Sequence, residues 1–267
     1  MKKIIFLTAY FMFTVATGIF AKVELPKRSW DLGTEISHIV YKEPDVMEEK
    51  GWMYGLAGSY TFREKFVFKT DGRAAFGQVD YSSPSSGSMD NLDDFIIEVR
   101  QVGGYDFCFS DNLVIMPYFG FGYRYLNDDS SGMATSTGAL GYERESNYFY
   151  SPIGVEAVGG LQDGWVSGVA LEYDYFWKGV QISHLSGANS SFADLENDQN
   201  KGYGLRASLK LKRKSEKIDF VVEPFIRYWK IKRSEEEPVS FSGVIIGTGY
   251  EPENNSTEFG IKLAVKF

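Results

Sequence analysis

Few side chains in this sequence of 267 residues could do nucleophilic, redox or metal chemistry. Cys108 is the single cysteine, so the chain cannot form an internal disulfide or offer a cysteine cluster to zinc or iron–sulfur. His38 and His184 are the two histidines, which leaves little room for imidazole-based metal chemistry. We therefore expect no metal ion and no cofactor. No Gly-x-Ser-x-Gly elbow with a matching histidine and aspartate set is present, so a serine hydrolase is disfavoured.

The composition narrows the classes of protein further. The chain carries 36 acidic and 28 basic residues, for a formal net charge of −8, which argues against a nucleic-acid partner. A mean hydropathy of −0.23 with 24% charged residues excludes a bundle of transmembrane helices. The unusual features are 16% aromatic residues together with 28 glycines. This combination favours β-structure near a membrane interface.

The N-terminus has the pattern of an export signal. Lys2 and Lys3 precede an apolar run that continues to Phe20, and the small residue Ala21 follows at the expected cleavage position. We expect residues 1–21 to be a signal peptide and residues 22–267 to form the mature domain. A single transmembrane anchor is the alternative, although the run is barely long enough to span a bilayer.

The mature sequence alternates between apolar and polar residues in ten segments. We predict strands at 29–41, 52–63, 66–81, 95–108, 113–126, 148–161, 165–178, 202–213, 217–232 and 256–267. The connections 64–65, 109–112, 162–164 and 214–216 are tight turns, whereas 42–51, 82–94, 127–147, 179–201 and 233–255 are long. Long loops at one end and short turns at the other are typical of outer-membrane barrels. The sequence therefore predicts an all-β fold, a ten-stranded antiparallel up-and-down transmembrane β-barrel, with a soluble β-sandwich as the alternative.

The two faces of these strands differ in polarity. In the last strand Phe259, Ile261, Leu263, Val265 and Phe267 share one face, and the other face collects charge, so the apolar face should point to lipid. The tryptophans near strand ends suit interfacial girdles. The terminal Phe267 resembles the end signal that the barrel assembly machinery reads. We expect the mature chain to lie in a bacterial outer membrane, in contact with lipid and lipopolysaccharide.

The inward face carries acidic and basic residues in equal number, which indicates a paired network. The acids are Glu35, Asp71, Glu98, Glu156, Glu172, Asp174, Glu223 and Glu258, and the bases are Lys69, Arg73, Arg100, Arg124, Arg206, Lys210, Arg227 and Lys262. Buried charges are tolerated when they are paired, and a ten-stranded barrel is far narrower than a porin. We expect these side chains to fill most of the lumen, and we therefore predict no general porin activity. A narrow channel remains an alternative.

The predicted loops are acidic, and this suggests where the protein meets its surroundings. Their carboxylates are Glu43, Asp45, Glu48, Glu49, Asp90, Asp93, Asp94, Asp128, Asp129, Glu235, Glu236 and Glu237. The simpler interpretation is an anionic surface held among lipopolysaccharide phosphates by divalent cations. The sharper one is a rim that binds cationic peptides or proteins. The run 194–198 alternates carboxylates but lacks the remaining spacing of a calcium loop.

Ten strands with five long loops at one end resemble the omptin family of outer-membrane endopeptidases. The local likeness lies within 141–267, at Gly141-Tyr142, Arg144, Pro152-Ile153-Gly154, Tyr173–Trp177, His184, Asp198-Gln199-Asn200, Gly260 and Lys262. The resemblance implies a water activated between an Asp-x-Asp pair and an Asp-x-His pair.

The catalytic pattern that the resemblance implies is incomplete in this chain. His184 falls where the family has its histidine, but Ile182 replaces the aspartate two positions earlier. The opposite pair would have to come from Asp90, Asp93 and Asp94, which form Asp-Asn-Leu-Asp-Asp instead of Asp-x-Asp. An imidazole without an orienting carboxylate would be a poorer base. We therefore lean against an enzyme, interpret His184 as an ordinary loop histidine, and expect a structural or surface-interaction role; an omptin-like endopeptidase is the alternative.

Overall fold

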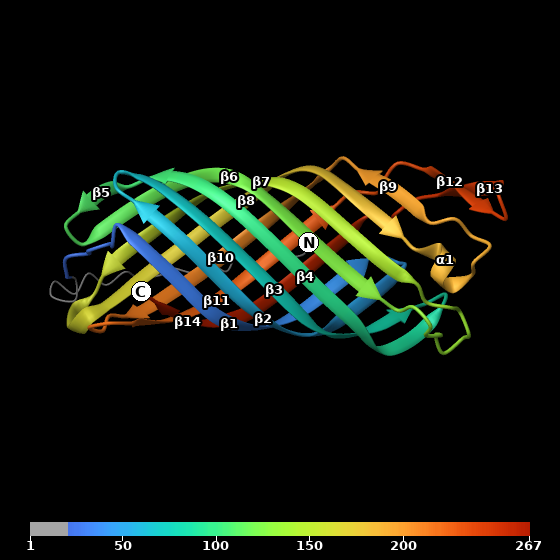
Figure 1. The fold of residues 1–267 in the computed structure, drawn as a ribbon, viewed down its shortest axis with the longest axis horizontal. Helices are drawn as coiled ribbons and strands as arrows, with labels where there is room; N and C mark the ends of the chain where they lie inside the picture. Colours follow the sequence, from blue (N-terminus) through green and yellow to red (C-terminus); the bar gives the residue numbers. More distant parts are fainter. Residues whose placement is uncertain (1–20) are drawn as a thin grey trace, which may run out of the picture.

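The computed structural model describes residues 21–267, so the predicted signal peptide lies almost entirely outside the described residues. Within that part of the chain, ten long strands close into an antiparallel barrel (Figure 1). They are β1 (Arg28–Glu43), β2 (Met47–Arg63), β3 (Phe66–Ser83), β4 (Gly87–Tyr105), β6 (Leu113–Asp129), β7 (Glu143–Gly160), β8 (Trp165–Ser183), β10 (Gly202–Arg213), β11 (Asp219–Ile231) and β14 (Asn254–Lys266). The predicted fold class is thereby confirmed.

Two strand pairings close the barrel. One joins the first and last barrel strands, and the other joins two strands that are separated in sequence by a long connection. β1 pairs with β14 along its length, from Asp31 opposite Lys266 to Lys42 opposite Asn255. β8 pairs with β10 across the excursion that carries β9 (Leu195–Gln199). Because every barrel strand has two neighbours, no barrel edge is left with unpaired backbone groups.

The remaining elements decorate the two ends of the barrel. The short strand β5 (Phe107–Ser110) and the 3-10 helix η1 (Gln162–Gly164) lie with the C-terminus at the end on the left of Figure 1, which we call the turn end. Helix α1 (Leu185–Ala188) and the hairpin of β12 (Glu237–Phe241) and β13 (Val244–Gly249) lie at the opposite end, which we call the loop end. No helix in residues 21–267 is long and apolar enough to cross a membrane.

Several predicted long loops are shorter in the structure, because the strands extend beyond their apolar segments. The predicted loops 42–51 and 82–94 are wrong: only 44–46 and 84–86 lie between strands there. Positive φ angles at Asp45 (65°) and Gly87 (86°) let the chain reverse in these tight turns. The predicted loop 233–255 also contains the β12–β13 hairpin. These strand ends alternate inward and outward, but their outward residues are polar, so the apolar pattern stops before the strand does.

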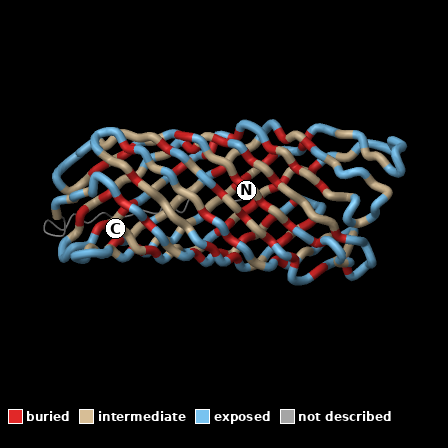
Figure 2. The backbone as a smooth tube through the Cα atoms, in the orientation of Figure 1, coloured by how far each residue is buried: buried red, intermediate tan, exposed pale blue. Residues whose placement is uncertain are grey.

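The outer face of the barrel is apolar over its middle and ringed by aromatic side chains toward both ends. Figure 2 shows exposed and buried positions alternating along the strands. Leu56, Phe76, Phe119, Leu171 and Leu263 are among the large apolar side chains exposed on the outer face. An apolar surface of this extent is rare on soluble proteins and is typical of a barrel that faces lipid.

The aromatic rings mark the limits of this apolar surface. Near the turn end, Trp30 packs against Tyr60 with ring centroids 4.7 Å apart. Toward the loop end, His38 lies between Trp52 and Phe259, at 5.2 and 5.4 Å. These rings have the arrangement of the interfacial girdles expected for a transmembrane barrel.

Candidate functional site

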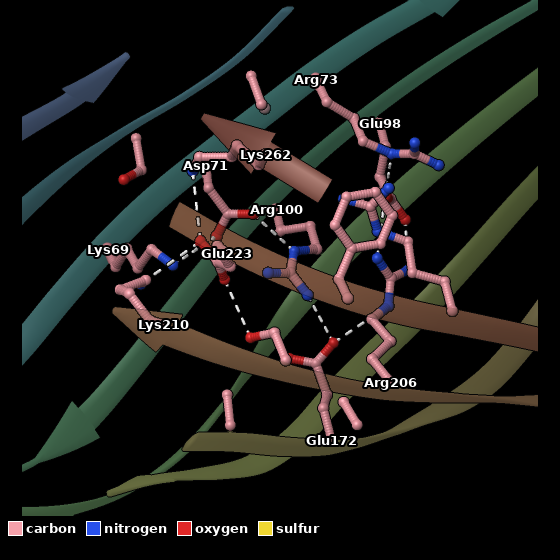
Figure 3. A pocket seen from close by; sticks show the side chains of 18 of the residues that line it. Lys69, Asp71, Arg73, Glu98, Arg100, Glu172, Arg206, Lys210, Glu223 and Lys262 are labelled. Atoms are coloured by element: carbon pink, nitrogen blue, oxygen red, sulfur yellow. Dashed lines mark hydrogen bonds and ion pairs between the residues drawn. The ribbon is translucent and has the colours of Figure 1, made fainter. Parts of the chain in front are cut away.

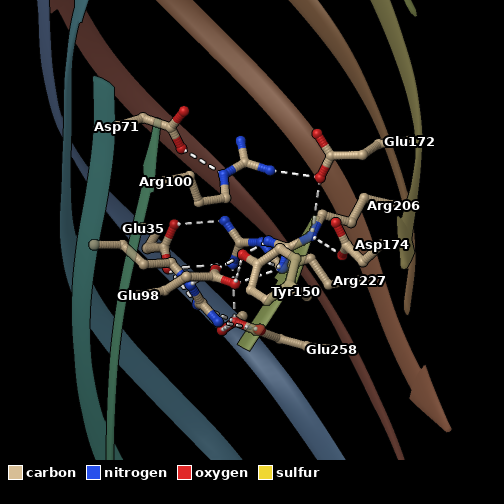
Figure 4. Close-up of polar contacts among 12 residues, drawn as sticks. Glu35, Asp71, Glu98, Arg100, Tyr150, Glu172, Asp174, Arg206, Arg227 and Glu258 are labelled. Atoms are coloured by element: carbon tan, nitrogen blue, oxygen red, sulfur yellow. Dashed lines mark hydrogen bonds and ion pairs between the residues drawn. The ribbon is translucent and has the colours of Figure 1, made fainter. Parts of the chain in front are cut away.

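The centre of the barrel holds a buried guanidinium shared by three carboxylates, Glu35, Glu98 and Glu258, which Figure 4 labels. Arg73 on β3 contacts Glu35 at 2.8 Å, Glu98 at 3.0 Å and Glu258 at 2.8 Å, and only 8% of the residue is exposed. Arg227 on β11 bonds Glu35 and Glu258, each at 3.1 Å, from the opposite side. Five strands, β1, β3, β4, β11 and β14, are thus cross-linked through the lumen.

A second set of pairs crosses the lumen beside the first (Figure 4). Arg206 on β10 contacts Asp174 at 2.7 Å and also pairs with Glu98. Arg100 on β4 bridges Asp71 at 2.7 Å and Glu172 at 2.5 Å. The hydroxyl of Tyr150 donates to Glu98 at 2.7 Å. Each buried charge in this set therefore has an opposite charge within hydrogen-bonding distance, which is the condition for tolerating it.

Toward the turn end the network loosens around a small cavity (Figure 3). The cavity has a volume of about 120 Å³ and is lined by Lys69, Lys210, Glu223 and Lys262, among others. Lys210 lies 3.7 Å from Glu156 and 3.8 Å from Glu223. A space of this size takes a few water molecules and is well below the size of a ligand pocket.

The lumen residues expected from the sequence point inward, with one difference in pairing. Arg124 forms no salt bridge within residues 21–267; its guanidinium instead lies over the ring of Tyr148, 5.6 Å from the centroid. Sequence reasoning also missed inward charges near the turn end, such as Asp31 bonded to Lys262 and Arg63 bonded to Asp106. Extending the inward parity to the full strand lengths would have found them.

Two apolar layers lie between the ionic network and the loop end, and the sequence reasoning missed both. Ile39, Met53, Val79, Leu92, Ile96 and Leu126 belong to one buried cluster. Tyr148, Tyr150, Phe176, Trp229 and Ile231 form the other. Gly122 makes room for this second cluster, since a Cβ there would collide with the ring of Tyr150. The interior is consequently occupied by apolar packing as well as by ion pairs.

A third group of charges closes the mouth of the barrel at the loop end. Arg144 bonds Glu43 at 2.6 Å and Glu251 at 2.8 Å, and the hydroxyl of Tyr41 lies within 3.3 Å of both carboxylates. Burial raises the pKa of Glu251 to about 7; Arg144 opposes this effect and the neighbouring Glu43 adds to it. One guanidinium therefore serves two carboxylates in this group.

Several carboxylates that the sequence assigned to an exposed rim are inside the barrel. Glu43, Glu49, Asp94 and Asp128 are buried, with 4–7% of each residue exposed. Asp94 and Asp128 face each other across β4 and β6. The prediction that these four acids contribute to an anionic surface is wrong, because each occupies an inward position on a strand that runs further than expected. Asp45, Asp90, Asp93 and Asp129 are exposed.

His184 lies on the outer side of the wall, where three carboxylates surround it. Its Nε2 is 2.9 Å from Glu145 Oε1 and its Nδ1 is 3.0 Å from Asp194 Oδ2. The hydrogen bonds with Glu145 and with Asp194 raise the pKa of the imidazole. The expectation of an unoriented ring is therefore wrong, because Asp194, ten residues later in the chain, is bonded to Nδ1. Glu143 joins the group, with its ligand oxygen within 4.8 Å of the other two.

The structure does not gather the four conditional catalytic candidates. Both ring nitrogens of His184 are bonded to Asp194 and Glu145, neither of which was a candidate. Asp94 is buried on the inner face, whereas Asp90 and Asp93 are exposed. The histidine and Asp94 thus lie on opposite sides of the barrel wall.

The architecture has a counterpart among solved structures. The outer membrane protease OmpT from Escherichia coli matches with a TM-score of 0.60 and 9% sequence identity, over 90% of this chain and 96% of that chain. The barrel has the omptin fold. The translocator domain of the autotransporter NalP from Neisseria meningitidis matches with a TM-score of 0.43 and 12% identity, over 90% of this chain and 88% of that chain. No family model matches the sequence, and no curated protein matches it.

The omptin fold confirms the predicted resemblance at the level of architecture. At 9% identity the likeness concerns the fold alone, and fold does not carry activity with it.

Proposed function

We propose that this chain is an exported outer-membrane barrel that does not conduct solutes and that acts through its loop end as a surface-interaction protein for cationic peptides or proteins. The observation that carries the proposal is the filling of the interior by side chains. Arg73 and Arg206 anchor ion pairs across the lumen, and the two apolar clusters fill it above them. A barrel filled in this way leaves its exposed end as the surface available for function.

The charge left over at the loop end favours a cationic partner. Lysines there are largely paired, as Lys42 and Lys50 are with Glu48. In contrast, Asp45, Asp90 and Asp129 form no salt bridge within residues 21–267 and are exposed. An excess of exposed carboxylates attracts cations and accelerates their encounter with the surface.

The β12–β13 hairpin adds an apolar contact surface at the same end of the barrel. It projects beyond the barrel wall in Figure 1. Val244, Ile245 and Ile246 follow one another at its tip and are 64, 68 and 60% exposed. Consecutive exposed apolar residues are unusual on a solvated surface and are typical of a contact site. A peptide with basic and apolar residues would match both features.

A binding experiment tests this proposal. Fluorescence anisotropy of a labelled peptide with alternating lysine and leucine, added to the barrel refolded in detergent micelles, should show saturable binding that weakens as salt is added. Neutralising Asp45, Asp90 and Asp129 to asparagine should weaken the binding about tenfold or more. The matched control replaces the buried Asp94 with asparagine and should leave binding unchanged. Binding that ignores both salt and the triple variant would contradict the proposal.

An omptin-like endopeptidase is the second candidate, and one observation favours it. His184 is oriented by Asp194 and polarised by Glu145, so the imidazole is not an ordinary loop histidine. Incubation of the refolded protein in lipopolysaccharide with dibasic peptides decides between the two functions. Cleavage that His184→Ala abolishes would establish the protease, and intact peptides after prolonged incubation would support the binding role.

A further inference from the structure

The outer wall of the barrel near the loop end carries a cluster that the interaction role does not use. Glu143 and Glu145 are two residues apart on β7 and therefore point to the same side. His184 directly follows β8, and its backbone N–H donates to the carbonyl of Glu143 at 2.9 Å. The three side chains come from adjacent strands and present ligand atoms within 4.8 Å of one another.

We propose that Glu143, Glu145 and His184 form a zinc site on the outer wall of the barrel, with Asp194 holding the imidazole in place. One nitrogen and two carboxylate oxygens are a donor set that zinc accepts, with a fourth position open to water. Calcium prefers oxygen ligands alone, so the imidazole favours zinc. The site goes beyond the proposed interaction role and beyond the expectation that the chain binds no metal.

The contacts around His184 have the arrangement of a metal-binding histidine. Nδ1 is engaged by Asp194, which leaves Nε2 directed toward Glu145. Asp194 is itself fixed, because its Oδ1 accepts hydrogen bonds from the backbone N–H of Ser186 at 3.1 Å and from the Ser186 hydroxyl at 2.7 Å. A carboxylate on the far nitrogen sets the tautomer and the orientation of a ligating histidine.

The distance between the ligand atoms of His184 and Glu145 is close to what zinc requires. Nε2 and Oε1 of Glu145 are 2.9 Å apart. Two ligands bound tetrahedrally at zinc–ligand distances of about 2.0–2.1 Å lie about 3.3 Å apart, so the side chains need to separate by a few tenths of an ångström. The carboxylate of Glu143 is steadied by Asn127, whose amide donates to Oε1 at 2.7 Å. Zinc would take the place of the proton between the imidazole and Glu145.

Charge and access also favour a cation here. Within residues 21–267, the salt bridges of Glu145 and Asp194 involve His184 alone, and Glu143 forms none. Three carboxylates therefore share one imidazole. The side chains of His184 and Glu145 are 29 and 24% exposed, so an ion can reach them from solvent.

Zinc titration of the refolded barrel tests the site. The protein in detergent micelles is stripped with a chelator and titrated with zinc chloride in an isothermal titration calorimeter. We expect one zinc ion per barrel. His184→Ala should weaken binding at least 100-fold, and Asp194→Asn, which keeps every ligand, should weaken it about 10–100-fold. His38→Ala is the matched control, because the other histidine packs between aromatic rings and should not affect binding.

Cobalt absorption provides a readout that does not depend on variants that fold poorly. Cobalt bound to wild-type barrel should give visible bands of a low-symmetry site with a nitrogen ligand, and zinc should abolish them while equimolar calcium should not. Heat-modifiable migration in gel electrophoresis identifies variants that have folded. No saturable zinc binding by the wild type, equal weakening by His184→Ala and His38→Ala, or displacement by equimolar calcium would each overturn the proposal.

Discussion

Replacement of Arg73 by methionine should destabilise the barrel strongly. The side chain is buried and contacts Glu35, Glu98 and Glu258. Methionine keeps much of the length of the side chain but removes the charge, so three buried carboxylates lose a partner. Breaking a buried ion pair costs about 3–5 kcal/mol.

The size of the effect is limited by the neighbouring arginines. Arg227 still bonds Glu35 and Glu258, and Arg206 still pairs with Glu98. We therefore expect a loss of about 3–5 kcal/mol, instead of the sum over three separate pairs. With a urea slope of about 2 kcal/mol per molar, this corresponds to a midpoint lowered by about 1.5–2.5 M.

Urea unfolding in detergent micelles, followed by tryptophan fluorescence, measures this change. Adding Glu258→Gln to the Arg73→Met variant removes one of the three carboxylates that lost Arg73 as a partner. It should restore part of the midpoint, giving a coupling of about 0.5–3 kcal/mol. Arg233→Met is the matched control, because Arg233 is half exposed and pairs with an exposed glutamate. If Arg73→Met shifted the urea midpoint no more than Arg233→Met does, the cross-linked lumen would be refuted.

Three other predictions concern the mouth, the packing and the hairpin. Glu251 has a pKa raised to about 7 in the folded barrel, so between pH 4.5 and 7 the folded chain holds a proton that the unfolded chain releases. The urea midpoint should therefore fall as the pH rises from about 4.5 to 7. Glu251→Gln should flatten that fall, and an equal slope in both proteins would contradict the raised pKa. Gly122→Val should lower the free energy of unfolding by about 1–3 kcal/mol, because the new side chain would collide with the ring of Tyr150. Gly103→Val, where a Cβ meets nothing within 4 Å, should lower it far less. Ile245→Ser at the exposed hairpin tip should leave the midpoint unchanged, and a marked loss would show that the hairpin is packed.

The alternation of apolar and polar residues was enough to predict the barrel. The strand 202–213 was predicted with its observed bounds, and the tight turns lie where polar residues interrupt the pattern. The loop-end boundaries were wrong for a physical reason. The outward face is apolar only where lipid covers it, so the outward residues Lys50 and Asp93 ended the visible pattern although their strands continue.

The interior was harder to predict than the wall. Parity placed Arg73 and Glu98 inside, but it could not tell that Ile39 and Ile96, which share that inward face, form an apolar layer above them. An apolar residue in a barrel strand is normally predicted to face lipid. Ile39 and Ile96 could have been placed inside only from their spacing to charged residues on the same strand that face inward.

The surroundings of His184 had no local sequence signal. Asp194 reaches the ring through a loop that contains a short helix, and Glu145 lies on the neighbouring strand. The register of β7 and β8, which sets Ile182 opposite Glu145, brings Glu145 close to His184. Register depends on how far each strand extends, which the pattern had underestimated, so the cluster was not foreseen.

Planar-bilayer recording of the refolded barrel tests the closed lumen most directly. The ion pairs and the apolar layers predict no stepwise conductance at neutral pH, even at high salt and applied voltage. Steady single-channel currents from correctly folded barrels, abolished by heat unfolding, would contradict the account and favour a narrow channel.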